Sequence, residues 1–185
     1  MQLTTERLIL REFQVEDWTA TYAYESDPTV VRYQSNGLYT PEESRAYIVR
    51  SMATAVAAPR RVFDLAVTLK SDGRLIGRCG LNIKNPEMNE AALWYVLHRS
   101  FWGRGLIPEA ARALVDFGFQ DLSVHRLWAE CDPRNVGSER VMQKLGMRKE
   151  AQFKESCFIK NEWCDSVVYG LLEREWHAAR RASPA

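Results

Sequence analysis

Residues 100–110, Ser-Phe-Trp-Gly-Arg-Gly-Leu-Ile-Pro-Glu-Ala, join an apolar, strand-like run at 91–97 to a helical pattern. Gly103 and Gly105 flank one arginine at the turn, and glycine adopts backbone angles that other residues avoid while leaving room beside the main chain. A helix that begins directly after such a turn directs unpaired N–H groups and the positive end of its dipole outward. Pro108 suits the first helical turn, where its missing N–H has no partner to lose. The stretch therefore predicts a cradle for a pyrophosphate group.

The same stretch has a simpler interpretation, in which the two glycines only permit a tight turn. Its spacing differs from the Gly-x-Gly-x-x-Gly pattern of dinucleotide-binding folds and from the Gly-rich pattern of P-loops. The turn alone leaves both interpretations open, so the choice depends on the rest of the chain.

The composition is that of an ordinary folded protein. A chain of 185 residues suits a single domain over residues 1–185, with a core at about 4–176. It carries 25 Lys and Arg against 24 Asp and Glu, for a net charge of +1. No basic block stands out, so nucleic acid is not an expected partner.

No feature of the sequence indicates a membrane or a metal ion. The first residues lack the apolar segment of a signal peptide, and no apolar run approaches the length that spans a bilayer. The four cysteines and three histidines are scattered, without the spacing of metal ligands. We therefore expect a cytoplasmic protein with reduced thiols, no membrane partner and no metal site.

Short apolar runs alternate between strand and helix patterns along the chain. Thr40 predicts a helix start, because it can cap the chain before Pro41 and form a capping box with Glu43. Asp72 and Gly73 are typical of a hairpin turn, and Gly146 stands where glycine ends a helix. The expected strands are 8–11, 62–69, 75–83, 90–97, 125–131, 152–158 and 166–172, and the expected helices are 15–24, 41 to before Pro59, 110–119, 135–145 and a short frayed one within 173–185.

These elements predict an α/β (α+β) fold. Antiparallel strands come first, a strand–helix–strand crossover surrounds the cradle, and a last hairpin turns through residues 160–162. A crossover of this kind joins parallel strands, and amphipathic helices need a sheet face to cover. We expect one mixed, largely antiparallel sheet with helices on both faces.

A second informative stretch is residues 132–147, Asp-Pro-Arg-Asn-Val-Gly-Ser-Glu-Arg-Val-Met-Gln-Lys-Leu-Gly-Met. Asn135 is a plausible helix cap, and Ser138 shares a helix face with Val141, Met142 and Leu145. Ser138 is thus the polar member of an inward-facing apolar stripe. Periodicity alone favours a simple role, in which its hydroxyl bonds to its own backbone.

Taken together, these stretches resemble the GNAT superfamily of acyl-CoA-dependent N-acyltransferases. Within it they are similar to the RimJ/RimL-type branch, named for enzymes that acetylate N-terminal amines of ribosomal proteins. The resemblance covers about residues 4–176, and four motifs in the right order are more specific than any one of them. The matching residues are 5–11, Leu75-Ile76-Gly77, 102–105 with Glu109 and Ala110, Asn135 with Ser138, and 144–147.

The resemblance implies a GNAT-like sheet in which a parallel strand pair splays apart, with acetyl-CoA as the cosubstrate and no metal. A free amine would then attack the thioester directly in a ternary complex. Ser138 would lie near the thioester sulfur and protonate the leaving thiolate. The implied cofactor-binding residues are Tyr95, Val96 and Leu97 with Asn135 and Ser138 along the pantetheine, and Trp102, Gly103, Arg104, Gly105, Leu106 and Ile107 at the pyrophosphate.

The departures from the family pattern concern the general base. Many members carry a glutamate at the position of Ala92, and RimL-like enzymes carry one at the position of Cys157. Cys157 is expected to be a buried, neutral thiol, because nothing near it in sequence would lower its pKa. Glu90 is our candidate base, through ordered water, since it shares a strand face with Ala92. Glu130 stands behind it, and a solvated charge at a strand edge is the simpler interpretation of Glu90.

Three functions fit the sequence: acetyl transfer to a small-molecule amine, acetylation of a protein N-terminus, and a non-catalytic acyl-CoA-binding module. The sequence favours the first, because aromatic residues could line a compact acceptor pocket. It leaves open the identity of the amine acceptor, the acyl-chain preference and the oligomeric state, a homodimer included. The aromatic residues in question are Tyr39, Trp94, Tyr95, Phe158 and Trp163.

Overall fold

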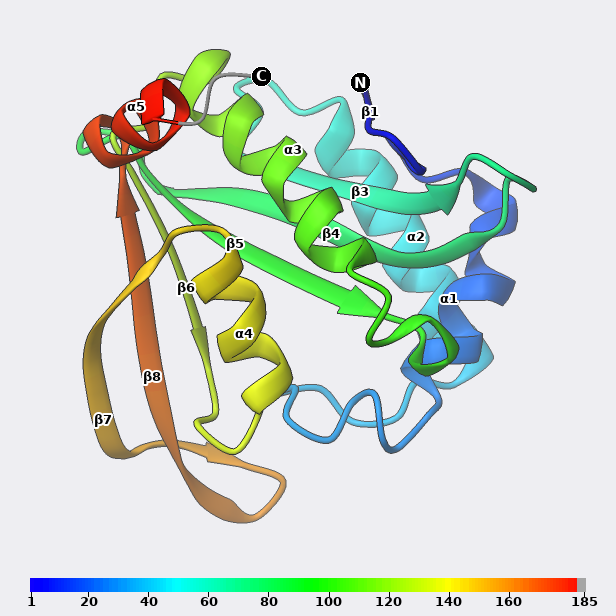
Figure 1. The fold of residues 1–185 in the computed structure, drawn as a ribbon. Helices are drawn as coiled ribbons and strands as arrows, with labels where there is room; N and C mark the ends of the chain where they lie inside the picture. Colours follow the sequence, from blue (N-terminus) through cyan, green and yellow to red (C-terminus); the bar gives the residue numbers. More distant parts are fainter. Residues whose placement is uncertain (183–185) are drawn as a thin grey trace.

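The computed structural model describes residues 1–182, which form one eight-stranded sheet with helices on both faces (Figure 1). The strand order across the sheet is β1-β2-β3-β4-β5-β6-β8-β7. All neighbours are antiparallel except β5 and β6. The expected mixed, largely antiparallel fold is therefore confirmed, and the expected terminal helix within 173–185 is described up to residue 182.

The first half of the sheet is antiparallel, with its strands side by side in chain order. The turn at Asp72 and Gly73 joins the strands at 62–69 and 75–85, and Gly73 has a φ of 71° in that turn. The strands are β1 (Gln2–Thr4), β2 (Leu8–Arg11), β3 (Val62–Leu69), β4 (Leu75–Asn85) and β5 (Glu90–Leu97).

The second half begins where β5 meets β6 (Arg126–Cys131) in parallel. Only three residue pairs join them, from Glu90 with Arg126 to Ala92 with Trp128, although both strands run on beyond that point. The two strands then diverge, as Figure 1 shows, and α4 (Val136–Lys144) lies across the opening. Strands β8 (Glu162–Leu172) and β7 (Arg148–Ile159) complete the sheet. The splayed parallel pair is thus present.

Helices cover the two faces of the sheet and bury two separate sets of apolar side chains. Helices α1 (Trp18–Glu25) and α2 (Pro41–Ala55) pack on one face, and α3 (Leu106–Gln120) and α4 on the other (Figure 1). Helix α5 (Glu173–Ala182) follows β8 directly. Short 3₁₀ turns at Val15–Asp17 and Arg99–Phe101 precede α1 and α3.

Local signals placed several helix ends correctly. The Thr40 hydroxyl accepts the Glu43 N–H at 3.1 Å, and the Glu43 carboxylate accepts the Thr40 N–H at 2.7 Å, which is the expected capping box. Asn135 caps α4 by accepting the Ser138 N–H at 3.2 Å. Gly146 has a φ of 82° just past that helix, as a terminating glycine does.

The structure differs from the expected elements at their ends. Helix α3 begins at Leu106, four residues before the expected start, so Pro108 does lie in its first turn. The expected helix at 15–24 opens as a 3₁₀ turn, and the last hairpin turns through Lys160 and Asn161 alone. Strand β1 was not expected, because three residues are too few to show a period.

A buried polar cluster ties α1 and α2 to the sheet. Arg78 on β4 donates to the Glu25 carboxylate at 2.9 and 3.1 Å, and to the Tyr47 hydroxyl at 2.8 Å. Tyr47 in turn donates to Asp64 on β3. The Glu25 side chain has no solvent exposure, and Arg78 is its ion-pair partner.

Candidate active site

The turn between β5 and α3 holds both of its glycines in the left-handed region. Gly103 has a φ of 74° and Gly105 a φ of 73°. A Cβ added at Gly103 would meet nothing within 4 Å, so the backbone there is open to an approaching group. Gly105 is the N-cap of α3, which leaves the N–H groups of Leu106 and Ile107 without helical partners. This geometry is that of the predicted cradle.

A carboxylate from α3 braces the cradle from behind. Glu109 accepts hydrogen bonds from the Thr5 hydroxyl at 2.5 Å, the Arg7 N–H at 2.8 Å and the Arg7 Nε at 2.6 Å. Arg7 also donates to the Arg104 carbonyl oxygen at 3.1 Å. Burial alone would raise the pKa of Glu109, but the hydrogen bonds from Thr5 and Arg7 outweigh it and lower that pKa. The charged carboxylate therefore fixes the cradle to the start of the chain.

The free edge of β5 presents main-chain groups to the opening of the parallel pair. The His98 N–H bonds to Ile76 on β4, and successive strand residues direct their backbone groups to opposite edges. The backbone groups of Tyr95 and Leu97 therefore point toward β6, beyond the last paired residues. The Trp102 indole donates to the Leu97 carbonyl oxygen at 2.7 Å, which folds this side chain against the strand.

A pair of hydroxyl groups spans the opening from β5 to α4. The Tyr95 and Ser138 hydroxyl oxygens lie 2.9 Å apart, and either can donate to the other. The Tyr95 hydroxyl also lies 3.1 Å from the Ser138 carbonyl oxygen. Burial raises the pKa of Tyr95, so its phenol stays protonated at neutral pH. Ser138 thus bonds across the site, rather than only to its own helix.

One cavity of about 730 Å³ connects the cradle, the hydroxyl pair and the loop between α1 and α2. Four cationic side chains line it, and no carboxylate does so within residues 1–182. Only one of the four, Arg134, forms ion pairs in this part of the chain. The lining is Thr29, Val30, Arg32, Tyr33, Gln34, Tyr95, Val96, Leu97, Phe101, Trp102, Gly103, Gly105, Leu106, Ile107, Pro108, Arg134, Asn135, Val136, Gly137, Ser138, Arg140, Val141 and Lys144.

The cavity brings together ten of the twelve residues that the sequence singled out. Arg104 contributes only its carbonyl oxygen to the brace, while its guanidinium lies 5.3 Å from the centre of the Phe101 ring. Glu90 lies at the closed end of the strand pair and bonds to Arg126 at 2.9 Å. It is five residues from Tyr95, about 16 Å along a strand, and on the opposite face.

Several other expectations need correction. Of the aromatic residues proposed for the acceptor pocket, only Tyr95 lines the cavity. Phe158 and Trp163 are exposed and pack on each other, and Tyr39 packs among the apolar residues under α1 and α2. Cys157 is half-buried rather than buried, and its burial raises its thiol pKa, so the thiol is neutral as expected.

Arg32, Tyr33 and Arg134 are among the lining residues that sequence reasoning did not single out. Arg32 and Tyr33 belong to the loop between α1 and α2, which carries no motif. Arg134 lies in the Asp-Pro-Arg-Asn stretch that precedes α4. An arginine directly before a helix cap, next to an aspartate, was the one available signal for it.

Comparison with known proteins defines the family. The model of the acetyltransferase (GNAT) domain matches residues 7–148. An uncharacterised N-acetyltransferase of Bacillus subtilis, YnaD, is 35% identical over 96% of this chain and 100% of its own length. A GNAT-family acetyltransferase structure from Bacillus anthracis has a TM-score of 0.86 and 32% identity, over 95% of this chain and 100% of that one. The chain belongs to the GNAT acetyltransferase family.

A more distant structure shares the fold. It is RimL, a ribosomal L7/L12 α-N-protein acetyltransferase in complex with coenzyme A, with a TM-score of 0.82 and 17% identity over 93% of this chain and 98% of that one. The protein is thus a GNAT N-acetyltransferase with relatives of the RimJ/RimL type. No helix among residues 1–182 is long and apolar enough to cross a membrane.

Proposed function

We propose that this enzyme transfers the acetyl group of acetyl-CoA to a primary amine by direct attack, and that the acceptor is a small molecule. The observation that carries the proposal is the single cavity that joins the cradle, the Tyr95–Ser138 pair and the α1–α2 loop. In one continuous cavity, acetyl-CoA and the amine can be bound at the same time, and the acetyl group can pass directly from one to the other. A ternary complex requires this.

The lining residues fit acetyl-CoA, which supplies an activated acetyl thioester. The open backbone at Gly103 and the free N–H groups of Leu106 and Ile107 would hold its pyrophosphate. Arg140 and Lys144, on α4, add positive charge without a carboxylate partner in the part of the chain that the structure describes. The backbone of Tyr95 and Leu97, with the Asn135 side-chain amide, would bond the pantetheine.

The Tyr95–Ser138 pair is suited to protonate a leaving thiolate. Ser138 lines the cavity, and its hydroxyl lies 2.9 Å from the Tyr95 phenol, while solvent water can return the proton that Ser138 donates. The same contact orients the hydroxyl before reaction. Ser138 is therefore the proposed general acid, with Tyr95 as the residue that positions it.

Direct attack is favoured over an acyl-enzyme, because the nearest thiol is a poor nucleophile. Cys131 ends β6, beside the opening, and burial raises its pKa to about 11. A neutral thiol attacks a thioester slowly, since the thiolate is the reactive form. Initial-rate plots in both substrates should therefore intersect, whereas parallel lines would indicate a covalent intermediate.

The proton of the attacking amine is proposed to pass to water. Glu90 remains a base candidate only through a long water chain, because it is bonded to Arg126 away from the hydroxyl pair. We therefore expect Glu90→Gln to keep the wild-type pH–rate profile within about twofold, whereas a base would lose about 10²-fold. A loss of that size on the limb along which the rate rises with pH would restore Glu90 as the base.

The direct test offers purified enzyme acetyl-CoA with a panel of small primary amines and of peptides with free N-termini. Coenzyme A release and acetylated products are measured together. The proposal predicts turnover with at least one compact amine at a higher kcat/KM than with any peptide. Preference for peptides would instead identify an N-terminal acetyltransferase, as the RimL relative is named. Acetyl-CoA binding without turnover of any amine would identify a binding module.

A further inference from the structure

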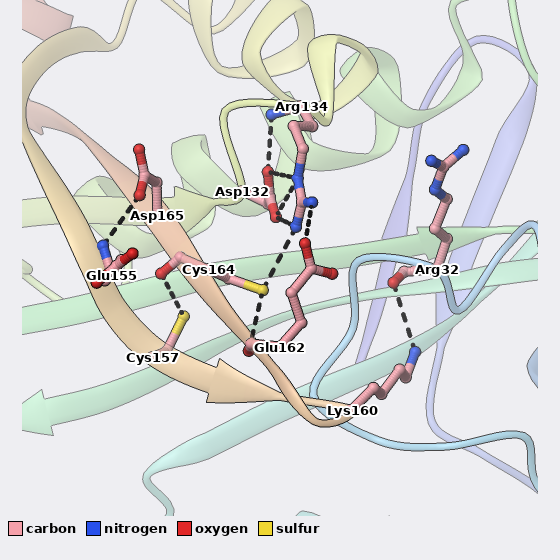
Figure 2. Close-up of polar contacts among 9 residues, drawn as sticks. All are labelled: Arg32, Asp132, Arg134, Glu155, Cys157, Lys160, Glu162, Cys164 and Asp165. Carbon is pink, nitrogen blue, oxygen red and sulfur yellow. Dashed lines mark hydrogen bonds and ion pairs between the residues drawn. The ribbon is translucent and has the colours of Figure 1, made fainter.

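Three segments far apart in the sequence meet at the side of the cavity formed by the α1–α2 loop (Figure 2). They are that loop, the turn after β6 and the tip of the β7–β8 hairpin. Each contributes one or two polar groups to a small set of contacts. Both the loop and the turn after β6 line the cavity itself, so these contacts lie at its boundary.

The first contact joins the hairpin tip to the loop. The Lys160 ammonium donates to the Val31 carbonyl oxygen at 2.5 Å and lies 3.5 Å from that of Arg32. Val31 is only 2% exposed, so the carbonyl that holds the lysine is firmly placed. Lys160 and Asn161 have φ values of 52° and 64°, which make a tight two-residue turn that aims the lysine at the loop.

The second contact joins the same hairpin to the turn after β6. Arg134 donates to the Glu162 carboxylate at 2.6 Å and to both oxygens of Asp132 at 2.6 to 3.0 Å. Its guanidinium also lies 6.0 Å from the centre of the Tyr33 ring in the loop. Arg134 therefore connects all three segments, and Figure 2 shows it above Glu162 with Lys160 at the loop.

We propose that Lys160, Arg134 and Glu162 form a strap that closes the acceptor side of the cavity and restricts the acceptor to compact amines. The inference rests on the proposed function and names residues that set its specificity. A peptide acceptor extends by about 3.3–3.6 Å per residue from its amino nitrogen, so it needs an open path out of the cavity. The strap occupies that path with hydrogen-bonded groups, whereas a small amine needs no such path.

The contact at Lys160 is suited to a strap because the lysine bonds to the backbone of the loop rather than to a side-chain carboxylate. Within residues 1–182 its partners are two carbonyl oxygens, and burial lowers its pKa. A lysine held this way positions the loop against the hairpin and takes no part in the chemistry. It is a positioning residue, and its loss should alter the choice of acceptor rather than acetyl-CoA binding.

The test compares Lys160→Ala and Glu162→Gln with Lys149→Ala. Lys149 is a matched control, because it lies on the same hairpin and its ammonium donates to the Gln152 side chain at 2.8 Å, away from the α1–α2 loop. For each protein, kcat/KM is measured for the best small amine and for a tripeptide with a free N-terminus. Hydrogen exchange of residues 27–39 is followed in parallel.

We expect wild type to favour the small amine. Lys160→Ala and Glu162→Gln should raise the peptide-to-amine ratio of kcat/KM by about tenfold, the size expected for a lost charge-assisted hydrogen bond. Faster exchange of residues 27–39 should accompany the change in Lys160→Ala. Lys149→Ala should alter neither quantity.

An unchanged ratio in both strap variants, or a wild type that prefers the peptide, would overturn the strap while acetyl transfer stands. Failure of wild type to acetylate any amine would instead remove the proposed function. In that case faster exchange of residues 27–39 in Lys160→Ala, but not in Lys149→Ala, would still show that the contact orders the loop. The two failures are therefore distinguishable.

Discussion

The Ser138 and Tyr95 hydroxyl oxygens lie 2.9 Å apart in the cavity wall, and this contact supports the roles proposed for them. Serine is a weak acid in water, so its hydroxyl needs a partner that orients it. Tyr95 supplies this from the neighbouring strand, with its own phenol held protonated by burial. Ser138 is therefore the proposed general acid, and Tyr95 is the residue proposed to position it.

The pair can be tested by removing each hydroxyl. Ser138→Ala should lower kcat by about 10²-fold with little change in acetyl-CoA affinity, because the lost interaction forms only as the thiolate leaves. Tyr95→Phe should cost less, since it removes orientation alone. Ser156→Ala serves as the control, because its hydroxyl lies 2.8 Å from that of Ser166 on an exposed surface outside the cavity lining. Full activity of Ser138→Ala would return Ser138 to a helix-end role, and an equal loss of affinity would make it a cosubstrate contact.

Glu109 is the residue whose charge the cradle depends on. Its pKa lies below the ordinary value of 4.5, so its contribution to stability is complete above that value and is lost as the pH falls through the lowered folded pKa. Glu109→Gln should therefore reduce the free energy of unfolding by about 1–2 kcal/mol at pH 7. In acid the variant and wild type should converge.

Urea unfolding at pH 7 and pH 3 measures both parts of this prediction. Glu42→Gln is the control, since the Glu42 side chain is 78% exposed beside Arg45. A Glu109→Gln difference that stays the same at both pH values would contradict a role for the carboxylate charge. Acetyl-CoA affinity should fall in the Glu109→Gln variant too. Arg7 would lose the carboxylate that holds it, and Arg7 is the residue that bonds to the Arg104 carbonyl oxygen of the cradle.

At the scale of elements, the buried cluster around Arg78 decides how α1 and α2 sit on the sheet. Glu25 comes from α1, Tyr47 from α2, and Asp64 and Arg78 from neighbouring strands. The α1–α2 loop that lines the cavity is suspended between these two helices. The cluster therefore also fixes the ends of the loop to which Lys160 is tied.

Arg78→Ala should destabilise the protein by about 3–5 kcal/mol, because it removes the ion-pair partner of the fully buried Glu25 carboxylate. Arg74→Ala, whose arginine side chain is 63% exposed in the β3–β4 turn, should change stability by less than about 0.5 kcal/mol. Denaturant midpoints at pH 7 give both values. A cost below about 1 kcal/mol for Arg78→Ala would show that the cluster does not hold the helices.

Elements with a local signal could be predicted from the sequence, and contacts between distant elements could not. The capping box at Thr40, the cap at Asn135 and the glycines at 103 and 105 depend on neighbours within four residues. The hydrogen bond from Thr5 to Glu109 joins residues 104 positions apart, and no pattern in either stretch indicates that the two are in contact. Strand alternation gave the face of Glu90, but not its place at the closed end of the parallel pair.

At the scale of the whole molecule, the separation of β5 from β6 creates the site. The two strands pair only over residues 90–92 and 126–128, and then diverge beneath α4 (Figure 1). Backbone groups that a neighbouring strand would otherwise occupy are left free to bond a ligand. The cradle, the hydroxyl pair and the strap all lie around this one opening.

The central claim is that the cradle binds acetyl-CoA, and calorimetric titration of Gly105→Val tests it most directly. Gly73→Val is a matched control, because Gly73 and Gly105 have φ values of 71° and 73° but only Gly105 lines the cavity. Both substitutions should lower the free energy of unfolding by about 1–2 kcal/mol, because valine is strained in the left-handed region. Wild type and Gly73→Val should bind one acetyl-CoA per chain with equal affinity, and Gly105→Val should lose binding while remaining folded. Unchanged affinity in folded Gly105→Val would contradict the account.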